Sequence, residues 1–217
     1  MITKLKKHHA CHVWFGSKRY YATPVGDFPG VTTVLSATKS EKDKAGLQRW
    51  RKSVGEVEAE RIKNDAIARG NYLHGCLENY LESALLPEDP TNPWWQSVQP
   101  FLSRIGNVAL IEGAIWHPEG FAGSVDCVAE VDGKLSIIDW KTSGKPKKIE
   151  YITDYLQQVA AYCAGVNRVY GTRIDRGYVV VALDNDDAQI FDVTGRDLMQ
   201  HWHDFKSRVR MFHSEEF

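Results

Sequence analysis

The stretch FAGSVDCVAEVDGKLSIIDWK, residues 121–141, decides the fold predicted for this chain. It contains two β-favouring runs joined by Asp132-Gly133, a dipeptide typical of a two-residue type I′ turn. In such a turn Val131 faces Lys134, and every other opposed pair can be counted outward from these two residues. The stretch therefore predicts a tight β-hairpin with a defined register.

This register brings two carboxylates together. Counting outward from the turn places Asp126 opposite Asp139, and Ser124 opposite Lys141. Opposed side chains on a sheet have Cβ atoms about 4.5–5.5 Å apart, so two negative charges there destabilise the hairpin. A hard divalent cation with oxygen ligands relieves that repulsion, and Mg²⁺ usually takes one or two protein carboxylates. We therefore predict a metal site at Asp126 and Asp139.

Lys141 adds a cation to the same face, because it follows Asp139 by two residues. An ammonium group there can hold a phosphate or help to orient an attacking water. A surface hairpin with unrelated charges is the alternative, but Asp139 follows the apolar run Leu135–Ile138, which indicates a buried strand. The opposite face is apolar and is predicted to be buried as one surface: Val125, Cys127, Ala129, Ile138 and Trp140.

The residues around the hairpin predict further strands and helices. The run VALIEGAIW, residues 108–116, is a strand that precedes the hairpin. After the hairpin we expect a helix over 151–166, strands over 177–183 and 189–193, and a last helix over 195–212. The order βββαβ with flanking helices predicts an α/β sandwich around a mixed sheet.

The first part of the chain is predicted to be mostly helical. A strand pair over residues 11–22 precedes a long proline-free, helix-favouring run over 42–83. The Pro-bearing stretch 86–100 reads as a connecting loop. We expect one domain over 1–217, in which residues 1–100 form a mostly helical region and residues 101–217 the catalytic core.

Composition indicates a soluble globular chain. Of its 217 residues, 43% are hydrophobic and 25% charged, close to the average for such proteins. The N-terminus lacks the apolar run of a signal peptide, and no segment reaches the roughly 20 apolar residues of a membrane span. The four cysteines lie far apart without CxxC spacing, which argues against a zinc site or an iron–sulfur cluster.

Charge is distributed unevenly along the chain. Residues 1–70 carry 14 Lys and Arg against 7 Asp and Glu, whereas residues 71–217 carry 13 against 21. Such a split fits a basic surface for nucleic-acid phosphates beside an acidic metal centre. A solvated basic helix face is the alternative.

At this point the motifs resemble a known family. Gly123-Ser124-Val125-Asp126, Asp139-Trp140-Lys141 and Gln158-x-x-x-Tyr162 are similar to the signature of RecB-like nucleases of the PD-(D/E)xK superfamily. More narrowly, residues 28–215 resemble the mitochondrial genome maintenance exonuclease group and its phage relatives, although Val125 stands where the signature has proline. The resemblance implies a restriction-endonuclease-like α/β core, and it leaves the first ~25 residues unplaced.

The resemblance also implies a set of metal ligands. These are Asp126, Asp139 and the backbone carbonyl of Trp140, with Lys141 as the catalytic lysine. His74 lies in Arg69-Gly70-Asn71-Tyr72-Leu73-His74, similar to a GxxxH motif, and is expected to be a ligand or near-ligand; a structural histidine is the alternative. We expect Gly70 to let the helix approach the sheet. Glu112 is a further candidate ligand, bound to the metal directly or through water. A salt bridge on its strand is the alternative role.

Further residues are candidates for DNA contact. Gln158 and Tyr162 lie on one helix face with Tyr151 and Tyr155, and the family places the first two beside the active site; packing is the alternative. Hydroxyl and ammonium contacts to phosphate are expected from Thr142, Ser143, Lys145 and Lys147, unless the lysines form only a solvated loop.

The expected function is a Mg²⁺-dependent exonuclease that hydrolyses single-stranded DNA from free ends, in replication, repair or recombination. Mn²⁺ is an expected substitute, and no iron–sulfur cluster is expected. We expect a monomer that threads the strand through its helical region, in the cytoplasm of a bacterial or virus-infected cell, alongside replication or recombination proteins. Alternatives are a flap or structure-specific endonuclease on the same fold, and a non-catalytic DNA-binding module.

Overall fold

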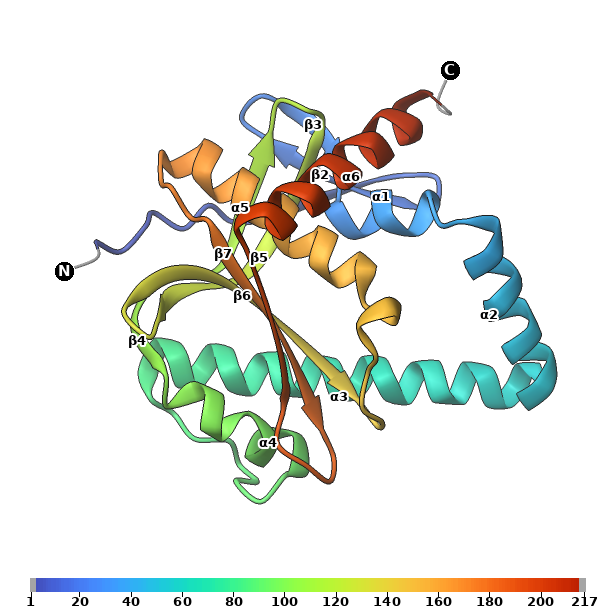
Figure 1. Ribbon diagram of the computed structural model, residues 1–217, viewed down its shortest axis with the longest axis horizontal. Coiled ribbons are helices and arrows are strands. Elements are labelled where there is room, and N and C mark those ends of the chain that lie inside the picture. Colours follow the sequence, from blue (N-terminus) through green and yellow to red (C-terminus); the bar gives the residue numbers. More distant parts are fainter. Residues whose placement is uncertain (1–2, 215–217) are drawn as a thin grey trace.

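A five-stranded mixed sheet forms the centre of the computed structural model, which describes residues 3–214 (Figure 1). The strand order is β4-β5-β6-β7-β8. Only β6 and β7 are parallel, and the helix α5 (Thr153–Tyr170) lies between them in sequence. The other neighbours are antiparallel, and the strands span Ile105–His117, Phe121–Val131, Lys134–Ser143, Arg176–Leu183 and Gln189–Thr194. The predicted α/β class with a mixed sheet is confirmed.

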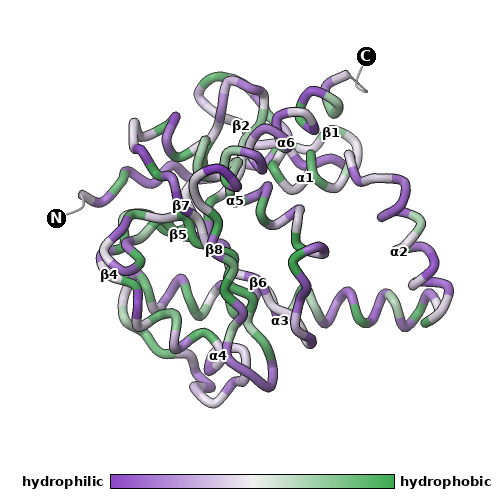
Figure 2. The backbone as a smooth tube through the Cα atoms, in the orientation of Figure 1, coloured by the Kyte–Doolittle hydropathy of each residue, from purple (hydrophilic) through white to green (hydrophobic). Residues whose placement is uncertain are grey.

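Helices cover both faces of this sheet. Apolar side chains of α1 (Val31–Ala37), α5 and α6 (Gly195–Ser214) share one buried cluster with the sheet. Those of α3 (Glu56–Ser83) and α4 (Pro93–Leu102) share a second cluster. The hydrophobic strands between them are visible as the green centre of Figure 2. Because strand side chains alternate, the sheet supplies both clusters.

The β5–β6 hairpin is built as predicted near its turn. Asp132 and Gly133 have φ values of 52° and 78°, as a type I′ turn requires. The predicted register holds from Val131 and Lys134 to Cys127 and Ile138.

Beyond Cys127 and Ile138 the described ladder ends, so the prediction that Asp126 pairs directly with Asp139, and Ser124 with Lys141, is wrong. Instead, the Asp126 carboxylate accepts a hydrogen bond of 2.9 Å from the backbone N–H of Trp140. The Trp140 N–H, which would otherwise donate to a carbonyl of β5 in the next ladder hydrogen bond, is thus bonded to a side chain.

Alternation along β5 is also interrupted at Asp126. Val125 packs into the α5-side cluster, whereas Cys127 and Ala129 pack into the α3-side cluster. The prediction of a single apolar hairpin face is therefore wrong for Val125. On the neighbouring strand Glu112 lies between the Ile111–Cys127 and Gly113–Val125 pairs, with a left-handed φ of 46°. Both strands are thus distorted at the same level of the sheet.

The N-terminal region forms a second sheet of three strands, β1 (Cys11–Phe15), β2 (Lys18–Thr23) and β3 (Gly26–Pro29). The predicted strand pair is confirmed, and β3 is an addition to it. The sheet is joined to the core by a parallel bridge between Gly30 and Ala122. It therefore lies beside β5, close to the point where β5 and β6 separate.

The long helical run is two helices, α2 (Glu41–Val54) and α3, separated at Gly55 with φ 88°. The stretch 86–100 contains the start of α4, so the prediction of a loop is wrong there. Asn92 caps that helix by accepting from the N–H of Trp95, and Pro93 occupies the first turn, where its missing N–H costs nothing. No helix within residues 3–214 is long and apolar enough to cross a membrane.

Candidate active site

A cavity of about 990 Å³ opens where β5 and β6 separate. Side chains from α3, β4, β5, β6 and α5 reach it, together with the hairpin β1–β2. The structure brings six of the predicted site residues to its wall: His74, Glu112, Asp126, Lys141, Gln158 and Tyr162. These residues are separated by up to 88 positions in sequence, and the sheet and its two helix layers place them together.

Three metal-binding side chains form a compact group. Donor atoms of His74, Glu112 and Asp126 all lie within 4.8 Å of one another. The Nδ1 atom of His74 is 3.8 Å from a carboxylate oxygen of Glu112 and 3.8 Å from one of Asp126. Each residue comes from a different element, α3, β4 and β5, so the group depends on their packing.

Trp140 holds this group in place through its main chain. Its carbonyl lies 3.0 Å from Nε2 of His74, which donates to it and thereby points Nδ1 toward the carboxylates. Its N–H donates to Asp126. The Trp140 indole is buried on the α3 side, against Phe101. The carbonyl that was expected to bind metal is thus engaged by the histidine.

Asp139 and Lys141 form a neighbouring ion pair. The carboxylate of Asp139 is fully buried, and its Oδ2 lies 2.5 Å from the Lys141 ammonium. Neither carboxylate oxygen has a partner in hydrogen-bonding geometry. Asp139 lies outside the compact donor group formed by His74, Glu112 and Asp126. Lys141 also lies over the Tyr155 ring, at 5.3 Å from its centroid.

The acidic surroundings alter proton binding at the site. Burial and the neighbouring Asp139 charge raise the pKa of Asp126 to about 7. Burial lowers the pKa of His74, but interaction with Glu112 and Asp126 outweighs it and raises the pKa to about 9. Burial also opposes the charge on Lys141, yet Asp139 and Asp126 raise its pKa overall. Lys141 therefore carries a positive charge at neutral pH in this structure.

These residues fit a divalent cation. Buried carboxylate oxygens without partners are costly. The Lys141 ammonium compensates Oδ2 of Asp139, whereas Oδ1 has no partner. The raised pKa of Asp126 shows that its negative charge lacks sufficient compensation. Two carboxylates and an imidazole nitrogen within 4.8 Å are a donor set for a metal ion. His74, Glu112 and Asp126 would hold the ion, with Asp139 beside them.

Gln158 and Tyr162 form one wall of the cavity. The Gln158 side-chain amide donates to the Tyr162 hydroxyl at 3.0 Å, and both side chains are almost fully buried. Gly123 makes room for the ring, since a Cβ there would lie 2.8 Å from Cε1 of Tyr162. Burial and the charge of Asp126 raise the pKa of Tyr162, so the phenol keeps its proton. The pair thus serves packing and also faces the site.

Other predicted contacts lie away from the cavity. Thr142, Ser143, Lys145 and Lys147 are not among the residues that line it. The Ser143 hydroxyl donates to the Lys145 carbonyl and accepts from its N–H, so it shapes the loop. The expected role of Gly70 is also wrong, because a Cβ there would meet nothing within 4 Å. Its missing side chain instead widens the cavity, which it lines.

The cavity also includes residues from the N-terminal region that the sequence did not assign to the site: His12, Arg19, Tyr21 and Thr32. Alternation within the predicted strand pair places Arg19 and Tyr21 on one face. However, the bridge from Gly30 to Ala122 spans 92 positions, and no local pattern indicates it.

A mixed sheet with carboxylates and a lysine at the point where two strands separate defines a metal-dependent nuclease core. The family model of the PD-(D/E)XK nuclease superfamily matches residues 98–210. The chain belongs to this superfamily.

Among curated proteins, the chain is similar to mitochondrial genome maintenance exonuclease 1. It is 34% identical to the Homo sapiens protein over 167 residues, which cover 71% of this chain and 48% of that protein. It is 32% identical to the Xenopus tropicalis protein over 203 residues, covering 86% of this chain and 58% of that one. The chain thus spans about half the length of the curated relatives it matches.

Solved structures with a similar fold include a putative exonuclease from Eubacterium rectale, with a TM-score of 0.46 and 16% identity over 70% of this chain and 68% of that one. An alkaline exonuclease from Laribacter hongkongensis matches with a TM-score of 0.39 and 16% identity, over 67% and 78% of the two chains.

Proposed function

We propose that this chain is a Mg²⁺-dependent deoxyribonuclease that degrades single-stranded DNA from free ends. The observation that carries the proposal is the group of His74, Glu112 and Asp126 beside the Asp139–Lys141 pair, in an open cavity. The relatives named above are exonucleases, which supports cutting from an end.

The side chains have separate roles in this reaction. His74, Glu112 and Asp126 hold the cation, and Trp140 fixes the orientation of two of them. The bound cation supplies a Lewis acid and a lower pKa for bound water. Lys141, kept protonated by Asp139 and Asp126, binds the scissile phosphate and stabilises the negative charge that develops on it.

Single-stranded DNA is favoured by the form of the cavity entrance. Helix α2 and the first half of α3 project from the sheet beside the site (Figure 1). Ile67, Gly70 and Asn71 of α3 line one side of the cavity, and the hairpin β1–β2 lines another. We infer that the DNA strand reaches the metal centre by passing between these two walls. An enzyme that takes its substrate through such a path needs a free end.

The test is the degradation of end-labelled linear single-stranded DNA with Mg²⁺, with EDTA, and by the Lys141→Ala variant. We expect rapid loss of substrate with Mg²⁺, no loss with EDTA, and a rate at least about 10²-fold lower for the variant. Covalently closed single-stranded circles should remain intact under the same conditions.

Each other outcome has a definite reading. Circles cut as fast as linear DNA would contradict the need for ends and favour a structure-specific or flap endonuclease. If DNA is bound but left intact with both Mg²⁺ and Mn²⁺, the nuclease proposal is rejected in favour of a non-catalytic DNA-binding module. Equal rates with Mg²⁺ and Mn²⁺ would support the nuclease reaction and contradict a preference for Mg²⁺.

A further inference from the structure

The hairpin β1–β2 has one face in the core and one turned outward. Its register pairs Val13 with Tyr20, and both pack into the α5-side cluster. Alternation then puts the neighbouring pairs, His12 with Tyr21 and Trp14 with Arg19, on the opposite face. We call His12, Trp14, Arg19 and Tyr21 the outer hairpin face.

The outer hairpin face is a continuous row of rings and one guanidinium. The His12 and Tyr21 rings meet edge to face at 4.7 Å between centroids. The Arg19 guanidinium lies over Tyr21, 5.4 Å from its centroid. Tyr21 is 5% exposed and lines the catalytic cavity, whereas Trp14 at the far end is 64% exposed. The row therefore leads from the metal centre to the open surface.

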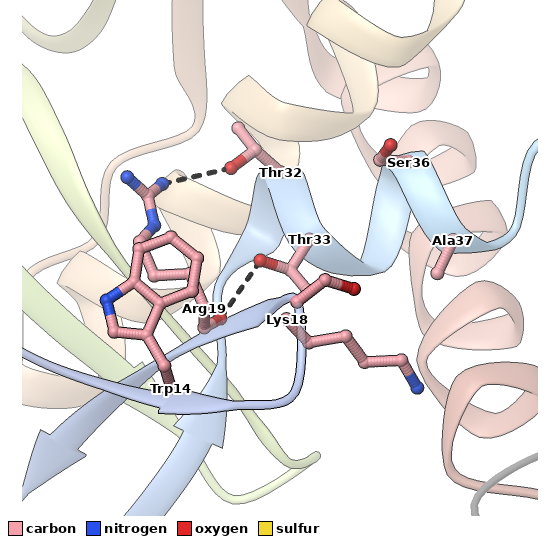
Figure 3. Close-up of a pocket in the computed structure, with 8 residues that line it drawn as sticks. Trp14, Lys18, Arg19, Thr32, Thr33, Ser36 and Ala37 are labelled. Atoms are coloured by element: carbon pink, nitrogen blue, oxygen red, sulfur yellow. Dashed lines mark hydrogen bonds between the residues drawn. The ribbon is translucent and has the colours of Figure 1, made fainter.

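A second cavity of about 480 Å³ lies under the exposed end of this row, between the hairpin and α1 (Figure 3). Trp14 and Arg19 line it on the hairpin side, and Thr32, Thr33 and Ser36 line it on the helix side. None of its lining residues is acidic. Arg19 and Thr32 line the catalytic cavity as well, so the two cavities adjoin at this pair.

Arg19 is fixed at the junction of the two cavities. Its guanidinium donates to the Thr32 hydroxyl at 3.2 Å, and its carbonyl accepts from the Thr33 hydroxyl at 3.0 Å, as the dashed lines in Figure 3 show. A guanidinium with five donors retains capacity for a phosphate when one donor is used. Its position is therefore set before any ligand binds.

An exposed aromatic ring beside a fixed cation is the arrangement that single-stranded nucleic acid needs. Bases stack on aromatic side chains without regard to sequence, and cations along the same path hold the phosphates. The hydroxyls of Thr32, Thr33 and Ser36 add neutral hydrogen-bonding groups for phosphate or sugar oxygens.

We infer that the outer hairpin face and the second cavity bind the nucleotides next to the scissile bond: Trp14 stacks on a base and Arg19 holds the adjoining phosphate. This inference rests on the proposed function, since it names where the DNA strand runs once it leaves the metal centre. It assigns a substrate-binding role to the N-terminal hairpin, outside the matched residues 98–210.

Binding is measured first, by fluorescence anisotropy of a labelled oligothymidylate in EDTA, so that no cleavage intervenes. Trp14→Ala should weaken binding about tenfold, equivalent to ~1.4 kcal/mol, and Trp14→Phe should restore most of it. Phe15→Ala is the matched control, because Phe15 is adjacent and 55% exposed but lies on the other side of the strand. It should bind as the wild type does.

Salt dependence tests Arg19 separately. The slope of the log association constant against log salt concentration is negative. The variant Arg19→Gln should make it shallower by about 0.7, the value for one phosphate contact on a single strand. Trp14→Ala should leave that slope unchanged, because a stacked base releases no counterion. Circular dichroism of each variant checks that the hairpin remains folded.

Catalysis distinguishes this inference from the proposed function. With Mg²⁺, Trp14→Ala should raise KM for DNA and leave kcat unchanged. If the wild type cleaves DNA and Trp14→Ala and Arg19→Gln bind it as well as Phe15→Ala does, the hairpin subsite is overturned and the nuclease stands. If the wild type cleaves nothing but binding falls as described, the nuclease is overturned, and the hairpin remains only a binding site for single-stranded DNA.

Discussion

Asp126 and His74 bind protons more tightly than free Asp and His side chains, with pKa values of about 7 and about 9. A metal ion needs both side chains deprotonated, so its binding must release protons. The metal affinity should therefore rise with pH, by up to about a hundredfold per unit below pH 7 and about tenfold per unit between pH 7 and 9.

Isothermal titration of Mn²⁺ or Mg²⁺ at several pH values measures this dependence. Repeating one titration in buffers with different ionisation enthalpies counts the protons released. His74→Ala should weaken the affinity and reduce the dependence to the single proton of Asp126, whose pKa rises once the His74 cation is gone. An affinity that stayed constant from pH 6.5 to 8.5 would contradict the proton-linked site.

Glu112 combines a left-handed φ of 46° with a position between two other metal-site side chains. Such a backbone conformation costs a non-glycine residue about 1 kcal/mol, and Asn tolerates it better than Glu. Without metal and above pH 9, where His74 has lost its proton, Glu112→Asn should raise the free energy of unfolding by roughly 0.5–1 kcal/mol, since strain and repulsion from Asp126 both fall. At pH 7 the lost interaction with the His74 cation opposes this gain.

Urea unfolding in EDTA and in Mg²⁺ checks this prediction. In Mg²⁺ the ranking should reverse, because the variant loses a ligand and gains less from the metal. A variant less stable than the wild type in EDTA would show that the Ser124–Glu112 hydrogen bond of 3.1 Å outweighs the strain.

At this scale the sequence indicated Asp126, Asp139 and Lys141, because one tight turn brings together the two strands that carry them. It could not show that the ladder ends at Cys127. That end depends on Asp126 bonding to Trp140 and on His74 arriving from another helix. A local sequence pattern can predict where a carboxylate lies, but the groups that it contacts depend on residues far away in the sequence.

Between α5 and β7 the packing leaves no space at Gly177. A Cβ there would lie 2.0 Å from Cγ1 of Val159, and 3.6 Å from its Cβ. Gly177→Ala should therefore destabilise the fold by about 1–3 kcal/mol through overpacking. The double variant with Val159→Ala removes the clashing methyl and should recover part of that loss.

Thermal unfolding of the wild type, both single variants and the double variant measures the coupling. Gly171→Ala is a poor control because φ there is 67°. Gly46→Ala is the better one, because it lies in a helix and its Cβ would meet only the end of the Arg49 side chain, at 3.9 Å. Additive losses in the double variant would mean that Val159 and Gly177 do not contact each other.

Element prediction succeeded where periodicity and turn signals agreed, as for β5, β6 and α5. It failed over 86–100, where four prolines and several polar residues favour a loop. There Asn92 and Pro93 start a helix whose interior, Trp95, Val98 and Phe101, is buried against the sheet. Tertiary burial, which composition does not reveal, stabilises that helix.

Over the whole molecule, local stability should differ sharply between the sheet and the projecting helices. Helix α2 buries none of its residues, and α3 buries only Ala59 before residue 73. The exposed ion pairs of these segments, such as Arg61 with Asp65, contribute little. Backbone amides of residues 41–70 should exchange hydrogen much faster than those of β5–β7.

Hydrogen exchange followed by mass spectrometry tests this, with and without single-stranded DNA. If the strand runs beside α3 as proposed, DNA should slow exchange in residues 56–75 and leave α6 unchanged. Slow exchange over 41–70 without DNA would show that these helices are held by contacts other than those described.

The layered architecture followed from the order of elements, and the uneven charge pointed to a basic N-terminal part. The placement of that part did not follow, because the hairpin β1–β2 reaches the site through Gly30 and Ala122, far apart in sequence. The three-stranded sheet packs on a surface that exists only once the core has folded, so the local sequence does not indicate it.

Trp140 contributes to the site only through atoms that every amino acid except proline possesses. Its N–H and C=O hold Asp126 and His74, while the indole fills the core on the far side of the sheet. A substitution of Trp140 should therefore change the packing of the α3-side cluster while both main-chain hydrogen bonds can still form. The superfamily's name leaves the residue between the acid and the lysine unspecified, and in this chain that residue positions Asp126 and His74 through its main chain alone.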